Sequence, residues 1–246
     1  MTANPVSILV HGSGRMGRAI LESALIDSRI RVAGVVVRRP PEVALPGAPV
    51  TYLDLSKALD ATKGAVVLDF SSPIGAAERV RKMAAAGHPL VLGTTGLDEA
   101  ADAAIQGAIA SIPVVVAPNT SAGLILLRQA IRAVAPGLGL GWDASIVDRH
   151  HRAKKDAPSG TAKLLERELR DAGAERVEIV SLRQGSVVGE HAVHLAGPDE
   201  ELILIHRAQS RNAFAAGALL AARFAATAAP GRYGMEHVLG NSRPHP

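Results

Sequence analysis

Val6-Ser7-Ile8-Leu9-Val10-His11-Gly12-Ser13-Gly14-Arg15-Met16-Gly17 is the stretch that decides the fold of this 246-residue chain. Residues 6–10 form an apolar run that predicts a buried strand, and residues 19–26 predict a helix after the glycines. Residues 31–37 are again apolar and β-branched, so they predict a second strand. Together these segments make one βαβ unit, which indicates an α/β fold with a parallel sheet.

The Gly-x-Gly-x-x-Gly pattern inside this unit predicts dinucleotide binding. Gly12 permits the tight turn, Gly14 lets a pyrophosphate approach the backbone, and Gly17 lets the helix pack against the strand. Arg15 and Met16 lie between these glycines and belong to the same predicted cofactor loop. A purely structural glycine turn is the alternative, and the flanking strands and helix argue against it.

The end of the second predicted strand indicates which dinucleotide binds. An NAD-binding domain usually carries an acidic residue there, which holds the ribose hydroxyls. This strand instead ends in Arg38 and Arg39, and the next acidic residue is Glu42. Guanidinium groups match phosphate oxygens, so the pair predicts NADPH as cofactor, with weaker use of NADH. The alternative is that both arginines simply begin a solvated loop.

The parallel pattern continues for three more predicted strands. They cover residues 65–70, 89–92 and 113–117, with helices predicted at 75–86 and 98–110. The carboxyl ends of such strands face the ligand crevice of the sheet. The residues that we therefore expect near the nicotinamide and its ribose are Ser71, Gly93, Thr94 and Thr95.

The pattern changes after residues 119–123, which we interpret as a hinge into a second domain. A helix is predicted at 124–134, and four strands of a mixed or antiparallel sheet at 144–147, 178–183, 190–196 and 201–207. A last helix is predicted at 214–227, followed by a polar, glycine-marked tail at 231–240. The predicted fold class is α/β, with a Rossmann-like dinucleotide-binding domain and a smaller α+β mixed-sheet domain for the substrate.

A dense cluster of reactive side chains lies between residues 148 and 162. We expect residues 149–157 to form an exposed loop, after which Pro158 stops any incoming helix and Ser159 caps a helix at 160–171. The first N–H groups of that helix, with the Thr161 hydroxyl, form an anion site that suits a substrate carboxylate.

His150 and Lys154 are the candidate proton donors of this cluster. A histidine of near-neutral pKa gives a proton near pH 7, and the lysine either donates one or holds a second negative group. Asp156 is expected either to orient Lys154 or to cap the loop, and Lys155 is expected to be solvated. A solvated basic loop is the alternative interpretation of the whole charge run.

Composition excludes several classes of protein. The net charge of +4 allows an anionic partner, but with 2% aromatic residues there is little to stack on bases, so we predict no nucleic acid partner. The absence of cysteine excludes disulfides and thiolate chemistry. No signal peptide is visible, and the longest candidate membrane segment, residues 213–229, is too short, so a soluble cytoplasmic protein with no membrane partner is predicted.

The other histidines divide into two groups. His191 and His206 stay open as further site residues on neighbouring strands. The four without a carboxylate partner at useful spacing, for which structural or surface roles are predicted, are His11, His88, His237 and His245. We predict no metal at the adjacent His150 and His151, because neighbouring residues seldom aim at one ion and no third ligand has helical spacing.

Taken in order and spacing, four motifs resemble the dihydrodipicolinate reductase family of bacterial lysine and diaminopimelate synthesis. They are Gly12–Gly17, Gly93-Thr94-Thr95-Gly96, Ala117-Pro118-Asn119, and His150-His151-x-x-Lys154 running on to Ser159-Gly160-Thr161. The resemblance spans essentially the whole chain. It implies transfer of hydride from NADPH or NADH to C4 of a cyclic dicarboxylated imine, with loss of water, to give tetrahydrodipicolinate.

The resemblance also implies roles and boundaries. His150 and Lys154 become the catalytic proton donors, and the positions implied to hold substrate are His151, Ser159, Gly160 and Thr161. Pro118 and Asn119 join the cofactor-binding residues. The implied dinucleotide domain covers residues 1–121, completed by 211–246, and residues 122–210 form the substrate and oligomerisation domain of a homotetramer.

This chain departs from the family pattern at three positions. Thr120 stands where a large apolar residue is usual, and Asp148 where a glutamate is usual. Arg38 replaces an acid that is common in members using both cofactors, which favours NADPH. Two alternatives remain: a related imine or keto-acid reductase of a specialised pathway, and an NADPH-sensing regulator, which the lack of a helix-turn-helix pattern disfavours.

Overall fold

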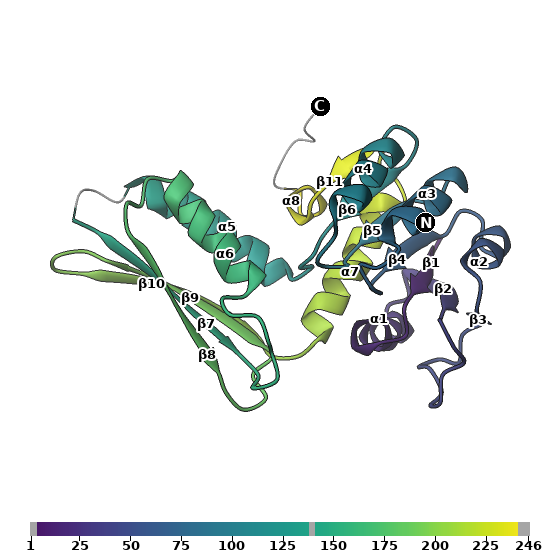
Figure 1. Cartoon of the computed structure of the whole chain (residues 1–246), viewed down its shortest axis with the longest axis horizontal. Helices are drawn as coiled ribbons and strands as arrows, with labels where there is room; N and C mark the ends of the chain where they lie inside the picture. Colours follow the sequence, from purple (N-terminus) through teal and green to yellow (C-terminus); the bar gives the residue numbers. More distant parts are fainter. Residues whose placement is uncertain (1–3, 138–140, 241–246) are drawn as a thin grey trace. The chain divides into compact units, whose positions relative to one another are not determined.

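The computed structural model describes residues 4–137 and 141–240. By contacts within the chain, it divides into two compact units (Figure 1). The first unit comprises the chain up to Thr120 together with the residues from Phe214 onward, and the second comprises Ser121–Ala213. The family resemblance implies nearby boundaries, at residues 121 and 211. No helix among the described residues is long and apolar enough to cross a membrane.

The first unit is built on a seven-stranded sheet in which every paired strand is parallel. In chain order its strands are β1 (Val6–His11), β2 (Ile30–Val36), β3 (Thr51–Tyr52), β4 (Val66–Asp69), β5 (Leu90–Leu92), β6 (Pro113–Val116) and β11 (Gly231–Tyr233). The order across the sheet is β11-β6-β5-β4-β1-β2-β3. The chain therefore reverses direction across the sheet between β1 and β4, which is the point where such folds bind ligands.

Six helices accompany this sheet among the described residues. They are α1 (Arg15–Leu25), α2 (Leu55–Ala61), α3 (Ala76–Ala85), α4 (Glu99–Ala108), α7 (Asn212–Ala225) and α8 (Met235–Val238). The central strands are fully buried, as parallel strands covered on both faces must be. Two of the helices begin at an aspartate whose carboxylate accepts a backbone N–H, Asp54 for α2 and Asp98 for α4.

The end of the chain was predicted wrongly as a polar tail. Residues 231–233 instead form β11, which pairs with β6, and a short helix α8 follows. The Tyr233 hydroxyl donates to the carbonyl of Ala229 at 2.9 Å, and the Tyr233 ring is buried. A three-residue strand is too short to show periodicity in the sequence, so only its pairing with β6 in the structure identifies it. The two-residue strand β3 escaped the sequence analysis for the same reason, and the seven-residue helix α2 was missed as well.

The second unit is a four-stranded mixed sheet with two helices against one face (Figure 1). Its elements are α5 (Ala122–Val134), the 3-10 turn η1 (Ala135–Gly137), β7 (Asp143–His150), α6 (Gly160–Asp171), β8 (Val177–Arg183), β9 (Gly189–Ala196) and β10 (Glu201–Ala208). The order is β10-β9-β7-β8, with β7 and β8 parallel and the other pairs antiparallel. The predicted fold class, α/β with a second mixed-sheet domain, is confirmed.

Strand β7 is longer than predicted, so His150 belongs to a strand and not to the loop that follows it. Residues 149–157 were expected to form an exposed loop, but Arg149 and His150 still belong to β7 and pair with Leu182 and Arg183 of β8. The polar run looked like a loop because buried ion pairs, and not apolar contacts, cover these side chains. His150 is therefore held on a strand, with little freedom to move.

Candidate active site

Strand register brings the polar residues of the second unit into two adjacent rows on the face that carries α5 and α6. Ser181, Asp148, His191 and His206 lie opposite one another across β8, β7, β9 and β10. The next row contains Arg183 and His150. Beyond the first row the same face becomes apolar, with Ile146 and its neighbours packed under the helices. Half of this face is therefore core, and the other half is a polar site.

Asp148 lies at the centre of the first row and is fully buried. Its Oδ2 accepts the backbone N–H of Ser159 at 2.8 Å, the Ser181 hydroxyl at 3.2 Å and the Arg183 guanidinium at 2.9 Å. Its Oδ1 lies 2.9 Å from Nδ1 of His150. Burial acts to raise the pKa of Asp148, but the contacts with His150, Arg183 and Ser159 outweigh it and lower the pKa well below its usual range.

Three histidine rings follow one another beside this carboxylate. The ring of His191 meets that of His150 edge-on at 5.2 Å and stacks on that of His206 at 6.3 Å. His206 Nε2 lies 3.0 Å from the Ser121 hydroxyl. Burial lowers the pKa of His191 to about 4, helped by the charges of His150, His206 and Lys154, and burial also lowers the pKa of His206. His191 is therefore neutral near pH 7.

The second unit is expected to lose stability as the pH falls from about 6.5 to 4. Unfolded His191 takes up a proton near pH 6.5, whereas the folded residue does so only near pH 4. Between these values the unfolded chain binds more protons, so the free energy of unfolding falls with falling pH, by up to about 3 kcal/mol. Urea unfolding at several pH values measures the slope. His191→Asn should flatten it, and an unchanged slope in this variant would contradict the assignment.

Ser159 begins α6 as predicted, and its own polar groups are all engaged. Its hydroxyl accepts the N–H of Ala162 at 3.1 Å and lies 3.2 Å from Nε2 of His191, while its N–H is bound to Asp148. Gly160, which is exposed, and Thr161 form the first turn of the helix. The start of α6 is thus attached to the polar row, and anion binding at Gly160 and Thr161 stays a prediction.

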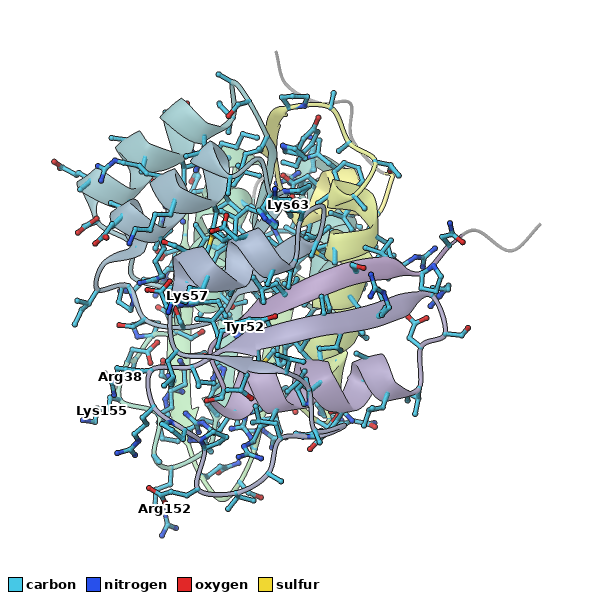
Figure 2. The ribbon with its side chains drawn as sticks, turned by 90° about the vertical axis from the view of Figure 1, so that its right-hand side faces the viewer. Arg38, Tyr52, Lys57, Lys63, Arg152 and Lys155 are labelled. Carbon is cyan, nitrogen blue, oxygen red and sulfur yellow. The ribbon has the colours of Figure 1, made fainter. Side chains whose placement is uncertain are left out.

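The loop between β7 and α6 holds the second candidate proton donor. Both carboxylate oxygens of Asp156 accept from Nζ of Lys154 at 2.8 Å, as the sequence had indicated, and Lys154 itself is only partly exposed. Arg183 donates to the carbonyl of Asp156 at 2.7 Å, which ties the loop to β8. His151 precedes the turn, and its carbonyl accepts the N–H of Lys154 at 3.1 Å. Figure 2 shows Lys155 directed outward, in agreement with a solvated side chain.

Asp148, His150 and His191 also bring three potential metal ligands within 4.8 Å of one another. The guanidinium of Arg183 already lies 2.9 Å from this carboxylate, so an added cation would meet a like charge. A cluster that includes a paired arginine suits proton handling better than metal binding. That this protein holds no metal remains a prediction.

In the first unit, the glycine loop has the geometry that a dinucleotide needs. Gly12 has a φ of +107°, and a Cβ on Gly17 would lie 1.9 Å from the carbonyl oxygen of Gly12, so both positions require glycine. A Cβ on Gly14 would meet nothing within 4 Å, which leaves open space at the start of α1. Arg15 and Met16 are the first residues of that helix. The loop therefore fits a pyrophosphate against a helix N-terminus.

Asp69, at the carboxyl end of β4, organises the neighbouring strand ends. It is fully buried and takes hydrogen bonds from the Ser71 hydroxyl at 2.5 Å and from Nε of Arg79 at 2.9 Å. The Thr94 hydroxyl lies 3.2 Å from the same carboxylate. Burial acts to raise the pKa of Asp69, but His11, Arg79 and Ser71 lower it to about 2. Ser71 and Thr94 are thus held at the carboxyl edge of the sheet.

His11 was wrongly predicted to lack a carboxylate partner. Its Nδ1 lies 3.4 Å from Oδ1 of Asp69, because the two residues are paired on the adjacent strands β1 and β4. His88 is buried between the carbonyls of Ala65 and Leu59, which fits the structural role predicted for it. His237 accepts the N–H of Gly234 at its Nδ1, 2.9 Å away, and His245 lies outside the described residues.

The remaining predicted cofactor residues occupy the same edge of the first unit. Arg38 and Arg39 follow β2 and are exposed, and Figure 2 shows the Arg38 side chain directed into solvent. Gly93 follows β5, where a Cβ would lie 2.1 Å from the Phe70 ring, so this glycine makes room for Phe70. The predicted residues Thr95, Pro118 and Asn119 follow β5 and β6.

Several residues of the site had no role in the sequence-based prediction. Ser181 looked like an ordinary strand residue, Arg183 stood out only through the resemblance to the family, and Asp148 only as a departure from the family pattern. His191 and His206 had been left open. The alternation of apolar and polar residues along β7, β9 and β10 signals one polar end of a strand face, but only the pairing register shows that these ends meet.

Family models match both units. Residues 6–120 match the model described as dihydrodipicolinate reductase, N-terminus, and residues 123–239 match the model of its C-terminus. The two matches together cover most of the chain.

Individual proteins agree with these matches. The 4-hydroxy-tetrahydrodipicolinate reductase of Xanthomonas campestris pv. campestris (strain B100) is 43% identical over 235 residues, which cover 95% of this chain and 97% of the relative. The enzyme of the same name from Rubrobacter xylanophilus is 38% identical, covering 96% and 99%. The fold resembles that of a dipicolinate-bound dihydrodipicolinate reductase from Paenisporosarcina sp. TG-14, with a TM-score of 0.81 at 19% identity over 95% of this chain and 99% of that one.

Proposed function

Because this chain belongs to the dihydrodipicolinate reductase family, and is an NAD(P)H-dependent oxidoreductase, we propose that it reduces 4-hydroxy-tetrahydrodipicolinate to tetrahydrodipicolinate in lysine and diaminopimelate biosynthesis. The observation that carries the proposal is the polar row of the second unit, where His150 lies on β7 beside the buried carboxylate of Asp148 and Ser159 begins α6. A proton donor and an anion-binding helix start therefore belong to one rigid cluster.

The charges of this cluster suit the substrate class that the family indicates. A cyclic imine with two carboxylates needs cations and N–H donors, which the start of α6 at Gly160 and Thr161 supplies together with Lys154 and His151. Reduction of a conjugated imine also requires protonation of the product, and His150 and Lys154 are the groups assigned to that task. The reduced nicotinamide supplies the hydride when it is bound to the first unit.

An assay with freshly made substrate tests the function directly. The preceding synthase generates the substrate in situ from pyruvate and aspartate semialdehyde, and oxidation of NADPH is followed by absorbance. Rapid turnover is expected with NADPH and slower turnover with NADH. Demonstrable NADPH binding without turnover of this substrate would keep the fold and move the function to a related imine or keto-acid reductase.

NADPH is the proposed cofactor, and Arg38 is proposed to recognise its 2′-phosphate. Arg38→Ala should raise the KM for NADPH about tenfold, as loss of a charge-assisted hydrogen bond does, and should leave the KM for NADH nearly unchanged. Arg31, exposed near the opposite end of the same strand, provides the matched control. Steady-state kinetics of Arg31→Ala should resemble the unchanged enzyme. An equal loss with both cofactors in Arg38→Ala would argue against 2′-phosphate recognition.

We further propose that the protein is a homotetramer that assembles through the second face of the mixed sheet. Among the described residues, Val180 and Leu182 of β8 and Ile203 and Ile205 of β10 are 40% to 53% exposed. Val180 and Ile205 share one row of that face with Val147 and Ala192, away from the buried apolar core. A second copy of the same sheet would cover such an apolar face.

Light scattering coupled to size-exclusion chromatography tests this assembly. The unchanged protein should elute as a tetramer, and Ile205→Glu should shift it to smaller species because a charge enters the apolar face. Ile26→Glu is the matched control, since Ile26 is 90% exposed at the end of α1 in the first unit. A monomeric unchanged protein, or a tetrameric Ile205→Glu, would refute the proposed interface.

A further inference from the structure

The two carboxylate oxygens of Asp148 contact different groups. Oδ2 binds the helix start and β8 through Ser159, Ser181 and Arg183. Oδ1 instead faces the imidazoles, 2.9 Å from Nδ1 of His150 and 3.5 Å from Nε2 of His191. Oδ2 therefore holds neighbouring elements together, and Oδ1 lies against the two histidine rings.

Oδ1 of Asp148 and Nδ1 of His150 are neighbouring buried atoms that each lack a well-aligned hydrogen bond. Among the described residues neither atom makes one, not even to the other, although only 2.9 Å separates them. A buried carboxylate oxygen without a donor is costly, and so is a buried ring nitrogen without an acceptor. A small rotation of the His150 ring that aims a hydrogen on Nδ1 at Oδ1 would satisfy both atoms.

The other nitrogen of His150 has a different environment. Nε2 lies beside Gly189 on β9, and a Cβ at that position would come within 3.1 Å of it. The ring is 12% exposed, so little of it is accessible. With Nδ1 taken up by Asp148, Nε2 is the nitrogen left to meet a substrate.

We propose that Asp148 is a positioning residue for the reduction, because it accepts a hydrogen bond from Nδ1 of His150 and so makes Nε2 the nitrogen that gives the proton. This inference rests on the proposed function. When Nε2 releases its proton to the substrate, the ring becomes neutral and keeps its hydrogen on Nδ1. A proton from water then restores the imidazolium, and Asp148 stays ionised throughout.

The second oxygen extends this role to the substrate site. Through Oδ2, the same carboxylate holds the N–H of Ser159 and the guanidinium of Arg183, which itself ties down the loop that carries Lys154. The proton donor and the anion-binding helix start are therefore positioned by one side chain. The low pKa of Asp148 keeps it an acceptor across the working pH range.

Nitrogen-15 NMR of the histidine rings tests the pair without any need for catalysis. The His150 signals are assigned by their loss in His150→Gln. In the unchanged protein the neutral His150 ring should carry its hydrogen on Nδ1. A ring protonated on Nε2 instead would overturn the proposal, whatever the activity of the protein.

Kinetics of two substitutions supply the second test. Asp148→Asn should lower kcat about 100-fold, the contribution typical of a positioned proton donor, and should leave the Kd for NADPH within about twofold. It should also change the His150 ring signals. Asp148→Glu, which keeps the carboxylate, should restore the Nδ1 hydrogen and much of the rate. A wild-type kcat in Asp148→Asn would overturn the proposal.

Glu168→Gln is the matched control. Glu168 is also a buried carboxylate of the second unit and is shared by Arg128 and Arg132, but it lies near the far end of α6. Its loss should destabilise the fold without altering the His150 signals or kcat. If Glu168→Gln also changes the His150 signals and lowers kcat, Asp148 acts through general stability and the proposal fails.

If Asp148→Asn does not fold, the His150 ring signals of the unchanged protein and of Asp148→Glu still test the proposal. If the unchanged protein leaves the substrate unreduced, only the proposed function fails.

Discussion

Replacing His150 or Lys154 by alanine is expected to lower turnover by about 100-fold or more, because each change removes a proposed proton donor. The affinity for NADPH should stay nearly constant, since the dinucleotide loop belongs to the first unit and both residues belong to the second. Stopped-flow measurement of NADPH oxidation gives the turnover, and fluorescence titration of NADPH gives the affinity. The larger loss identifies the donor of the decisive proton.

Lys155→Ala is the control for this pair of substitutions. Lys155 is exposed and adjacent to Lys154, so its removal changes the net charge of the loop equally. We expect Lys155→Ala to keep nearly full turnover. If both His150→Ala and Lys154→Ala keep wild-type rates, neither residue takes part in the reaction. If Lys155→Ala loses as much as Lys154→Ala, the loop acts through its overall charge.

Gly217→Ala is expected to be the most destabilising small substitution in the first unit. A Cβ on Gly217 of α7 would lie 1.7 Å from the carbonyl oxygen of Thr120, which is backbone and cannot turn aside. Thr120 is buried, and its hydroxyl donates to the carbonyl of Phe214 at 2.6 Å. This contact joins the two chain segments that make up the first unit. Separating these backbones should cost about 3 kcal/mol or more.

Gly107→Ala provides the comparison, because it is the same glycine-to-alanine change but is expected to raise the free energy of unfolding. Gly107 is exposed in α4, and a Cβ there would meet nothing within 4 Å. Alanine should stabilise that helix by up to about 1 kcal/mol. Thermal unfolding of both variants measures the difference. Equal melting temperatures would mean that α7 yields at Thr120 more easily than the structure indicates.

The residues around Thr120 also explain one departure from the family pattern. The sequence marked this position because a large apolar residue is usual there. In the structure the Thr120 side chain is 1% exposed and hydrogen-bonded to α7, so it belongs to the packing between the two chain segments of the first unit. Thr120 is accommodated locally, through its hydrogen bond to the carbonyl of Phe214.

Local signals in the sequence predicted much of the architecture. The glycine loop and α6 were recognised because turns and caps depend on neighbouring residues: Gly12 has the positive φ that its position requires, and Ser159 caps the helix as expected. The long buried strands were recognised by their apolar runs. Elements of two or three residues, such as β3 and β11, carry no period and were missed.

Several residues of the candidate site were predicted from the sequence, but their arrangement in space was not. His150, Lys154 and Ser159 follow one another in one motif, and their chemistry can be read without a structure. That Asp148 meets Ser181, His191 and His206 depends on the register of four strands, and that His11 meets Asp69 depends on the pairing of β1 with β4.

The fold class, the glycine loop and the start of α6 could be predicted from the sequence, because the turns, helix caps and periodicities behind them involve residues a few positions apart. The tertiary structure alone decided which side chains share the buried row around Asp148. Pairing between distant strands sets that row, and a shift of one residue in register would turn every one of these side chains to the opposite face.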